Sequence, residues 1–232
     1  MSIITNIIHD EFALIAINAN AHKDAKDFER AVLNNSNNIM MSISGNAIPQ
    51  NYMEAFKMCT HRKEAIALLQ DYINSTFHQK TLESSDLEDN TKDTQQVCLC
   101  YFDESKQKFC SYTVSVSNQH RSTDIKYSVA KQLLYRCVGS ESEQLTTLFQ
   151  LKGVRSAMQN FALQGKGVND IMEVIDITQK MYDTISLIDH NVTLTPHSQY
   201  WAIDVESKTF KQIDFHRQYY SLIHDTDTQN AA

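Results

Sequence analysis

The sequence lacks the features that mark several large classes of protein. Among its 232 residues, no apolar run approaches the ~18 residues that a membrane-spanning helix needs. Positive charge is also scarce, because the formal net charge is −7, and this argues against a nucleic-acid groove or a polybasic membrane patch. The apolar N-terminal stretch has no basic residue before Asp10 and Glu11, so no signal peptide is expected. We therefore expect a soluble cytoplasmic protein without nucleic-acid or membrane partners.

The common ligand-binding motifs are missing as well. The 5 cysteines are odd in number and form no CxxC, and the 9 histidines form no HExxH. Neither GxxxxGK[ST] nor GxGxxG occurs. We expect no disulfide framework, no metal and no cofactor. Cys98 and Cys100 alternate within a strand-like run, which predicts reduced thiols packed in a core.

The apolar pattern predicts alternating clusters of strands and helices. Strands are predicted at 3–8, 12–18, 39–44, 97–102, 109–116, 199–205 and 209–215. Helices are predicted at 49–77, 123–138, 142–164 and 168–188. A short strand or helical turn is predicted at 23–33, a mobile surface loop at 79–95 and a disordered tail at 223–232. Strand clusters separated by helices favour an α+β fold, here as a single domain over 1–222.

Four segments follow one another in an order that is known from one family. They are a strand–turn–strand, IITNIIHDEFALIAINANA; a strand, glycine turn and helix, NNIMMSISGNAIPQNYMEAF; a hairpin, CLCYFDESKQKFCSYTVS; and a helix end, MYDTISLIDHNVTLT. This set resembles the proteasome β-type family of N-terminal nucleophile (Ntn) hydrolases. The resemblance implies a four-layer αββα sandwich and is loosest at 118–150, where a helix is added or replaced.

The resemblance implies a nucleophile at the start of the first hairpin. Met1 precedes Ser2, and Met before a small residue is normally removed. The Ser2 oxygen would then attack a carbonyl while its own α-amine, with a pKa near ~8, takes the proton. The alternative is that Met-Ser is only a common way for a chain to begin.

Five further residues match the family's site, and two of them depart from it. Asn18 stands where the family has Asp, and Arg30 stands where it has Lys. Arginine keeps its proton, so it can act only electrostatically. The neighbouring segment 23–26 also holds Lys and Asp residues that could compensate if the alignment slips. Otherwise Asn18 is an ordinary half-buried polar residue and Arg30 a surface cation.

The other three matches keep the family's residue types. Gly45 matches the glycine whose backbone N–H serves an oxyanion hole, although a glycine often only completes a turn. Asp183 and Ser186 match the pair that steadies the N-terminal amine. They could equally be ordinary polar residues at a helix end.

The leading interpretation is a proteasome-subunit-like protein that is degenerate or weakly active in peptide or amide hydrolysis. The alternatives are an active N-terminal serine peptidase using Ser2, a non-enzymatic scaffold of the same fold, and a small-amide hydrolase. The family forms rings, so the resemblance implies a homo-oligomer, with the apolar faces of helices 51–77 and 168–188 as contact layers. It leaves open whether an ATPase is a partner.

Overall fold

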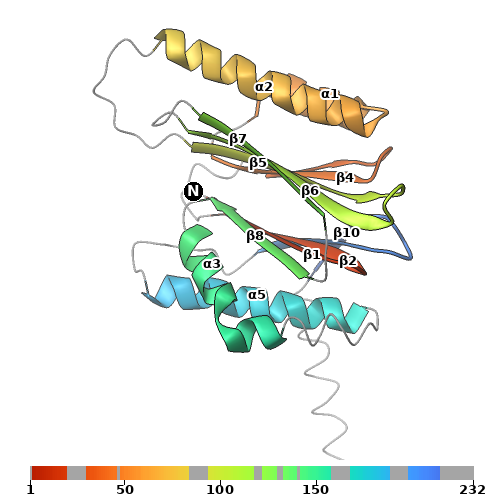
Figure 1. Cartoon of the computed structure of the whole chain (residues 1–232), viewed down its shortest axis with the longest axis vertical. Coiled ribbons are helices and arrows are strands. Elements are labelled where there is room, and N and C mark those ends of the chain that lie inside the picture. Colours follow the sequence, from red (N-terminus) through yellow and green to blue (C-terminus); the bar gives the residue numbers. More distant parts are fainter. Residues whose placement is uncertain are drawn as a thin grey trace, which may run out of the picture.

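The computed structural model mixes strands and helices, which confirms the α+β class (Figure 1). All strand pairs in it are antiparallel. The residues that the structure describes are 2–19, 30–45, 48–83, 94–117, 122–129, 133–139, 142–157, 168–188 and 198–214.

The first sheet, called the β1 sheet below, has five strands in the order β10-β9-β2-β1-β8. Its strands are β1 (Ser2–His9), β2 (Phe12–Ala19), β8 (Leu133–Gly139), β9 (Gln199–Asp204) and β10 (Lys211–Ile213). The β1–β2 hairpin lies in its centre, and both faces of that hairpin are buried. This burial explains why the hairpin is apolar nearly throughout instead of alternating with polar residues.

The second sheet, called the β5 sheet, also has five strands, in the sequential order β3-β4-β5-β6-β7. Its strands are β3 (Ala31–Asn34), β4 (Ile39–Ser44), β5 (Thr94–Asp103), β6 (Lys108–Ser117) and β7 (Ser122–Val129). The β5–β6 hairpin turns at 104–107, with Asp103 paired to Lys108. The predicted hairpin at 97–102 and 109–116 is therefore confirmed, with longer strands.

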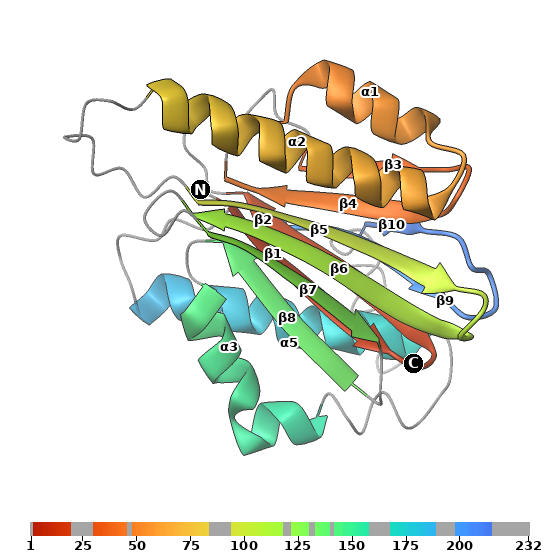
Figure 2. The same ribbon diagram turned by 45° about the horizontal axis from the view of Figure 1, so that its top comes forward.

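Helices cover the outer face of each sheet (Figures 1 and 2). On the β5 sheet lie α1 (Gln50–Met58) and α2 (Arg62–Glu83); on the β1 sheet lie α3 (Ser142–Gln150) and α5 (Val168–Ile188). A short helical segment at 152–157 follows α3. The apolar faces of α1, α2 and α5 pack on their own sheets, so the prediction that these faces form contacts between subunits is wrong.

The two sheets share a third apolar layer between them. Ile4, Ile8 and Ile15 of the β1 sheet pack there with Met40 and Phe109 of the β5 sheet. At the hairpin-turn end, the layer is closed by two ion pairs that join the sheets, Asp10–Lys108 at 3.0 Å and Glu104–Lys208 at 3.4 Å.

One polar side chain interrupts this inter-sheet layer. Asn6 lies between Ile4 and Ile8 on β1, so its side chain is directed toward the inter-sheet layer. It is fully buried, and among the described residues neither its Nδ2 nor its Oδ1 has a hydrogen-bond partner. An amide in this state costs free energy, because its hydration is lost without compensation.

The predicted helix at 123–138 is wrong, because β7 and β8 occupy this range. Ile125, Val129 and Leu133 stand four residues apart, as on a helix face. Ile125 and Tyr127, however, also alternate as in a strand. In the structure they pair with Val114 and Tyr112 of the neighbouring strand β6. Cross-strand pairing therefore overrides the local spacing.

The other differences concern the ends of elements. The predicted helix at 49–77 is two helices, interrupted at 59–61, and α2 extends through residues predicted as loop, up to Glu83. The predicted helix at 142–164 is α3 and the 152–157 segment as far as the structure describes it. In 23–33 only the part from residue 30 onward is described, and it enters β3. Residues 84–93, 158–164 and the tail 223–232 lie outside the described residues.

Candidate functional site

Ser2 begins β1, which lies between β2 and β8 in the β1 sheet. Its backbone pairs with Ala19 at the end of β2, and the next residue, Ile3, pairs with Gly139 at the end of β8. In both views the N-terminus lies at the same end of the molecule as the C-terminal end of α5 (Figures 1 and 2). The side chain of Ser2 lies outside what the structure describes. The backbone thus places Ser2 at the end of the sandwich opposite the ion-paired hairpin turns.

Asn18 lies one pair further along the same hairpin, opposite Ile3. It is fully buried, and its Nδ2 donates to the Oγ of Ser198 at 2.9 Å. Ser198 in turn donates to Gln179 Oε1 on α5 at 3.0 Å. Asn18 is therefore held toward α5 and the start of β9, and it is more deeply buried than the half-buried residue that the sequence suggested.

Arg30 and Gly45 meet at the ends of β3 and β4. Arg30 Nη1 donates to the carbonyl oxygen of Gly45 at 2.8 Å, and the Arg30 carbonyl accepts from the amide of Ile43 at 2.9 Å. Burial lowers the pKa of Arg30, yet a guanidinium stays charged in proteins. The predicted cation, Arg30, and the predicted glycine, Gly45, are therefore in contact. The cation is bonded to a neutral carbonyl.

The conformation of Gly45 explains its residue type. Its φ is 98°, a left-handed value that side chains with a Cβ rarely adopt. The chain turns here from β4 toward α1. Glycine is thus required by the turn itself.

Asp183 and Ser186 lie on the last turns of α5. Asp183 is exposed, and its Oδ1 accepts a hydrogen bond from Gln179 Nε2, one turn earlier, at 2.9 Å. Ser186 is half-buried. Both therefore lie toward the end of α5 that is on the same side of the molecule as the N-terminus (Figures 1 and 2).

The described hydrogen bonds sort the predicted residues into two groups. Asn18 and Asp183 are joined through Ser198 and Gln179, whereas Arg30 is joined to Gly45. The first group belongs to the β1 sheet and α5, and the second belongs to the β5 sheet.

Sequence reasoning missed the residues that link Asn18 to Asp183. Gln179 Oε1 also accepts from the Tyr200 hydroxyl at 2.6 Å. The i, i+4 spacing of Gln179 and Asp183 was a readable sign of a bond on one helix face. The contacts with Ser198 and Tyr200 had no such sign, because they join segments far apart in sequence.

A second buried polar contact lies beneath α5. The Tyr182 hydroxyl donates to Thr5 Oγ1 at 2.7 Å, and that oxygen is 3.4 Å from Cys137 Sγ. Burial raises the pKa of Tyr182 far above its usual range, so the phenol keeps its proton and remains a donor. This contact fixes α5 on β1.

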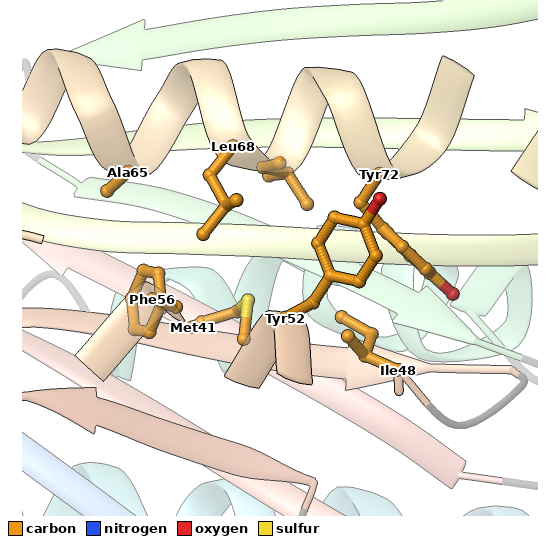
Figure 3. Close-up of a pocket in the computed structure, with 8 residues that line it drawn as sticks. Met41, Ile48, Tyr52, Phe56, Ala65, Leu68 and Tyr72 are labelled. Atoms are coloured by element: carbon orange, nitrogen blue, oxygen red, sulfur yellow. The ribbon is translucent and has the colours of Figure 1, made fainter. Parts of the chain in front are cut away.

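A small cavity lies on the other side of the molecule, between α1, α2 and β4 (Figure 3). Its volume is about 10 Å³, close to the least space that a water molecule needs. Met41, Phe56, Leu68 and Tyr72 are among its largely apolar lining. It is a packing gap in the helix-covered core.

Other kinds of site were searched in the part of the chain that the structure describes. There, no group of three or more His, Cys, Asp or Glu side chains could hold a metal ion. No helix among the described residues is long and apolar enough to cross a membrane. Cys98, Cys100 and Cys110 are buried and in no disulfide, and Cys98 Sγ lies 3.1 Å from Ser111 Oγ.

No family model matches the sequence, and no curated protein sequence matches it.

Proposed function

We propose that the chain is a proteasome-β-type-like member of the Ntn-hydrolase fold whose hydrolytic site is weak or inactive. The supporting observation is the arrangement of layers. Two antiparallel sheets face each other, helices cover both outer faces, and the first hairpin lies at the centre of one sheet with Ser2 at its open end. Fold analogy carries this step, and it speaks for architecture more strongly than for activity.

The chemistry at that end supports weak activity. A serine attacking a carbonyl needs a base and a preorganised positive neighbour. The α-amine of Ser2 can serve as the base once Met1 is removed. The neighbouring carboxylate is missing, because Asn18 is a neutral amide bonded to Ser198. The cation is Arg30, which is bonded to the Gly45 carbonyl.

The expected loss is large. Removal of one preorganised group at such a site typically costs ~10²–10³ in rate, and here the acid and the lysine are both replaced. A serine also lacks the methyl group that restricts the rotamer of a threonine, so the attacking oxygen is less well placed. The scaffold role is favoured for these reasons.

A panel of fluorogenic peptides tests this proposal on wild type and Ser2→Ala. Equal background rates in both proteins are expected. Robust turnover that Ser2→Ala abolishes would instead establish an active N-terminal serine peptidase. Turnover of small amides alone would favour the small-amide hydrolase. Intact-mass measurement accompanies the panel, because a retained Met1 or an acetylated Ser2 excludes the mechanism.

Assembly into a homo-oligomer is the second part of the proposal. The helix faces that cover the sheets are used within the chain, so contacts between copies would use the outer faces of the helices. Met58 on α1 and Leu187 on α5 lie exposed there, at 78% and 75%. Light scattering should give a mass several times 26.6 kDa. A clean monomer over a wide concentration range would contradict assembly.

A further inference from the structure

In the hydrogen bonds that link Asp183 to Asn18, the donor and the acceptor of each bond are fixed. The carboxylate of Asp183 determines them. An ionised carboxylate can only accept hydrogen bonds. The amide of Gln179 must therefore present its Nε2 to Asp183, as observed at 2.9 Å. Its Oε1 is consequently directed the other way, toward β9.

At β9, two hydroxyl groups donate to that oxygen. Tyr200 donates to Gln179 Oε1 at 2.6 Å, and Ser198 donates to it at 3.0 Å. Burial raises the pKa of Tyr200, so its phenol keeps the proton that it donates. The hydroxyl of Ser198 also lies within reach of the Tyr200 oxygen. Ser198 has a single proton, and either acceptor uses it.

The oxygen of Ser198 therefore offers only lone pairs to residue 18. Asn18 Nδ2 satisfies them by donating at 2.9 Å from a fully buried position. A carboxylate at this position would bring acceptor against acceptor at a fully buried residue. The hydrogen bond to Ser198 would then be replaced by repulsion between two oxygen atoms, which is costly.

We infer that Asp183, Gln179 and Ser198 form a relay that sets the hydrogen-bond polarity at position 18 and requires a donor there. Gln179 and Ser198 are positioning residues in this relay. The meaning for catalysis rests on the proposed function: the relay excludes the carboxylate that a proteasome-β-type site carries at this place. The asparagine is then one part of a co-adapted set, and a single reversion to Asp does not restore the acid.

A rival explanation is that any charge buried at position 18 is costly, whatever its neighbours do. A double-mutant cycle separates the two. Asn18→Asp is introduced into three backgrounds: the wild type, the Asp183→Asn variant and, as the matched control, the Asp176→Asn variant. Asp176 lies on the same helix and also acts on the pKa of Tyr200, but its carboxylate is bonded to Lys180. Asp176→Asn thus removes a nearby charge and leaves Gln179 untouched.

The relay predicts a specific pattern of melting temperatures. Asn18→Asp should lower Tm by about 5–10 °C in wild type, as expected for a buried unsatisfied group in a chain of this size. An asparagine at 183 can donate to Gln179, which lets the Gln179 amide turn over and frees the Ser198 proton for the new Asp. In Asp183→Asn the loss should therefore shrink by at least half, and in Asp176→Asn it should stay unchanged.

Two results would overturn the relay. Equal losses in all three backgrounds would show a general cost of burial, and equal relief by Asp183→Asn and Asp176→Asn would show plain charge repulsion. If Asn18→Asp does not fold in wild type, Asn18→Asp combined with Asp183→Asn should still fold. Failure of this double variant to fold would also count against the relay. The readout is stability, so a failure here leaves the peptidase test untouched, and the reverse holds as well.

Discussion

The two halves of the molecule satisfy their buried polar groups to different degrees. In the half made of the β5 sheet with α1 and α2, buried hydroxyl and thiol groups bond within the sheet, and an amide satisfies a helix end. This amide is Asn34, whose Nδ2 donates to the carbonyls of Phe56 and Cys59 at 2.6 and 3.0 Å, where α1 ends. In the half made of the β1 sheet with α3 and α5, Tyr182 joins a helix to a strand, and Asn6 has no hydrogen-bond partner among the described residues.

The difference shows which role the buried polar side chains have in each half. Backbone groups at helix ends need partners, and a side-chain amide that supplies them stabilises the fold. Polar groups inside a layer satisfy each other or stay unsatisfied, and they specify position more than they add stability. The β5 half thus pairs its described buried polar groups within the sheet and at a helix end, and the β1 half carries the linked polar residues near Ser2.

The largest effect is expected from Asn34, the buried amide at the end of α1. Asn34→Ala should cost about 3 kcal/mol, because two carbonyls lose a donor and the amide of Asn37 loses its acceptor. Denaturant unfolding measures this change. Asn37→Ala is the control. It removes a single side-chain bond, to Cys59, and should cost about 1 kcal/mol. Equal losses in the two variants would contradict the special weight given to Asn34.

Asn6 is equally buried and should respond with the opposite sign. Asn6→Leu keeps the approximate shape and removes two unpaired polar atoms, so the free energy of unfolding should rise by about 1–2 kcal/mol. The same substitution at Asn34 should lower it, which makes Asn34→Leu the matched control. If both variants lose stability to the same extent, Asn6 has a partner in solution and the contrast fails.

A smaller effect is expected where α5 meets β1. Tyr182→Phe removes the bond to Thr5 and should cost about 1 kcal/mol by denaturant unfolding. Tyr135→Phe is the control, because the buried Tyr135 hydroxyl makes no hydrogen bond of good geometry among the described residues, although Thr5 and Cys137 lie near enough to affect its pKa. Its ring stacks on Phe149, with 3.7 Å between the ring centroids. That variant should be neutral or slightly stabilising. A larger loss for Tyr135→Phe than for Tyr182→Phe would reverse the assignment.

The smallest effect concerns the start of α2 and depends on pH. Glu64 Oε2 accepts from the amides of Thr60 and His61 at 2.9 and 3.2 Å, as in a capping box. Backbone hydrogen bonds from Thr60 and His61 lower the pKa of Glu64 below its usual 4.5. This contribution is present above pH 4.5 and is lost as the pH falls through the lowered pKa.

Hydrogen exchange of the Thr60 and His61 amides measures this loss. Their protection should fall as the pH is lowered below about 4.5, once the intrinsic exchange rate is corrected for pH. Glu64→Gln keeps an uncharged acceptor and should show weaker protection without the pH dependence. The same pH dependence in Glu64→Gln would assign the titration to another group.

The strands of the two central hairpins could be predicted because their local pattern agrees with their tertiary role. The β-branched runs of β1 and β2 and the turn before Lys108 are local signals. Ile125 and Leu133 could not be assigned in this way, since their spacing also fits a helix and only pairing with β6 and β1 decides. The break between α1 and α2 could have been predicted, because Thr60 followed by Glu64 is a pattern typical of a helix start.

The site was predictable only in part. The alignment brought Arg30 to Gly45, and the topology places Asn18 beside the start of β1. The partners of Asn18 come from α5 and β9, roughly as far away in sequence as the chain allows, and no local pattern announces them. Side-chain direction at such a place depends on the whole set of hydrogen bonds, which a linear sequence does not display.

The strand order of the two sheets also sets an order in time. Each strand of the β5 sheet pairs with the next one along the chain, so its connections are shorter than those that complete the β1 sheet and close at a lower entropic cost. In the β1 sheet, by contrast, Ile3 pairs with Gly139 and Phe12 pairs with Asp204, so these partners are synthesised much later. During synthesis the β1–β2 hairpin precedes the other described strands, but its neighbours β8 and β9 follow much later. Its isoleucine-rich edges therefore lack strand partners until the sheet is complete. We therefore expect pulse-labelled hydrogen exchange to show the β5 sheet protected first, with aggregation during refolding starting from β1 and β2.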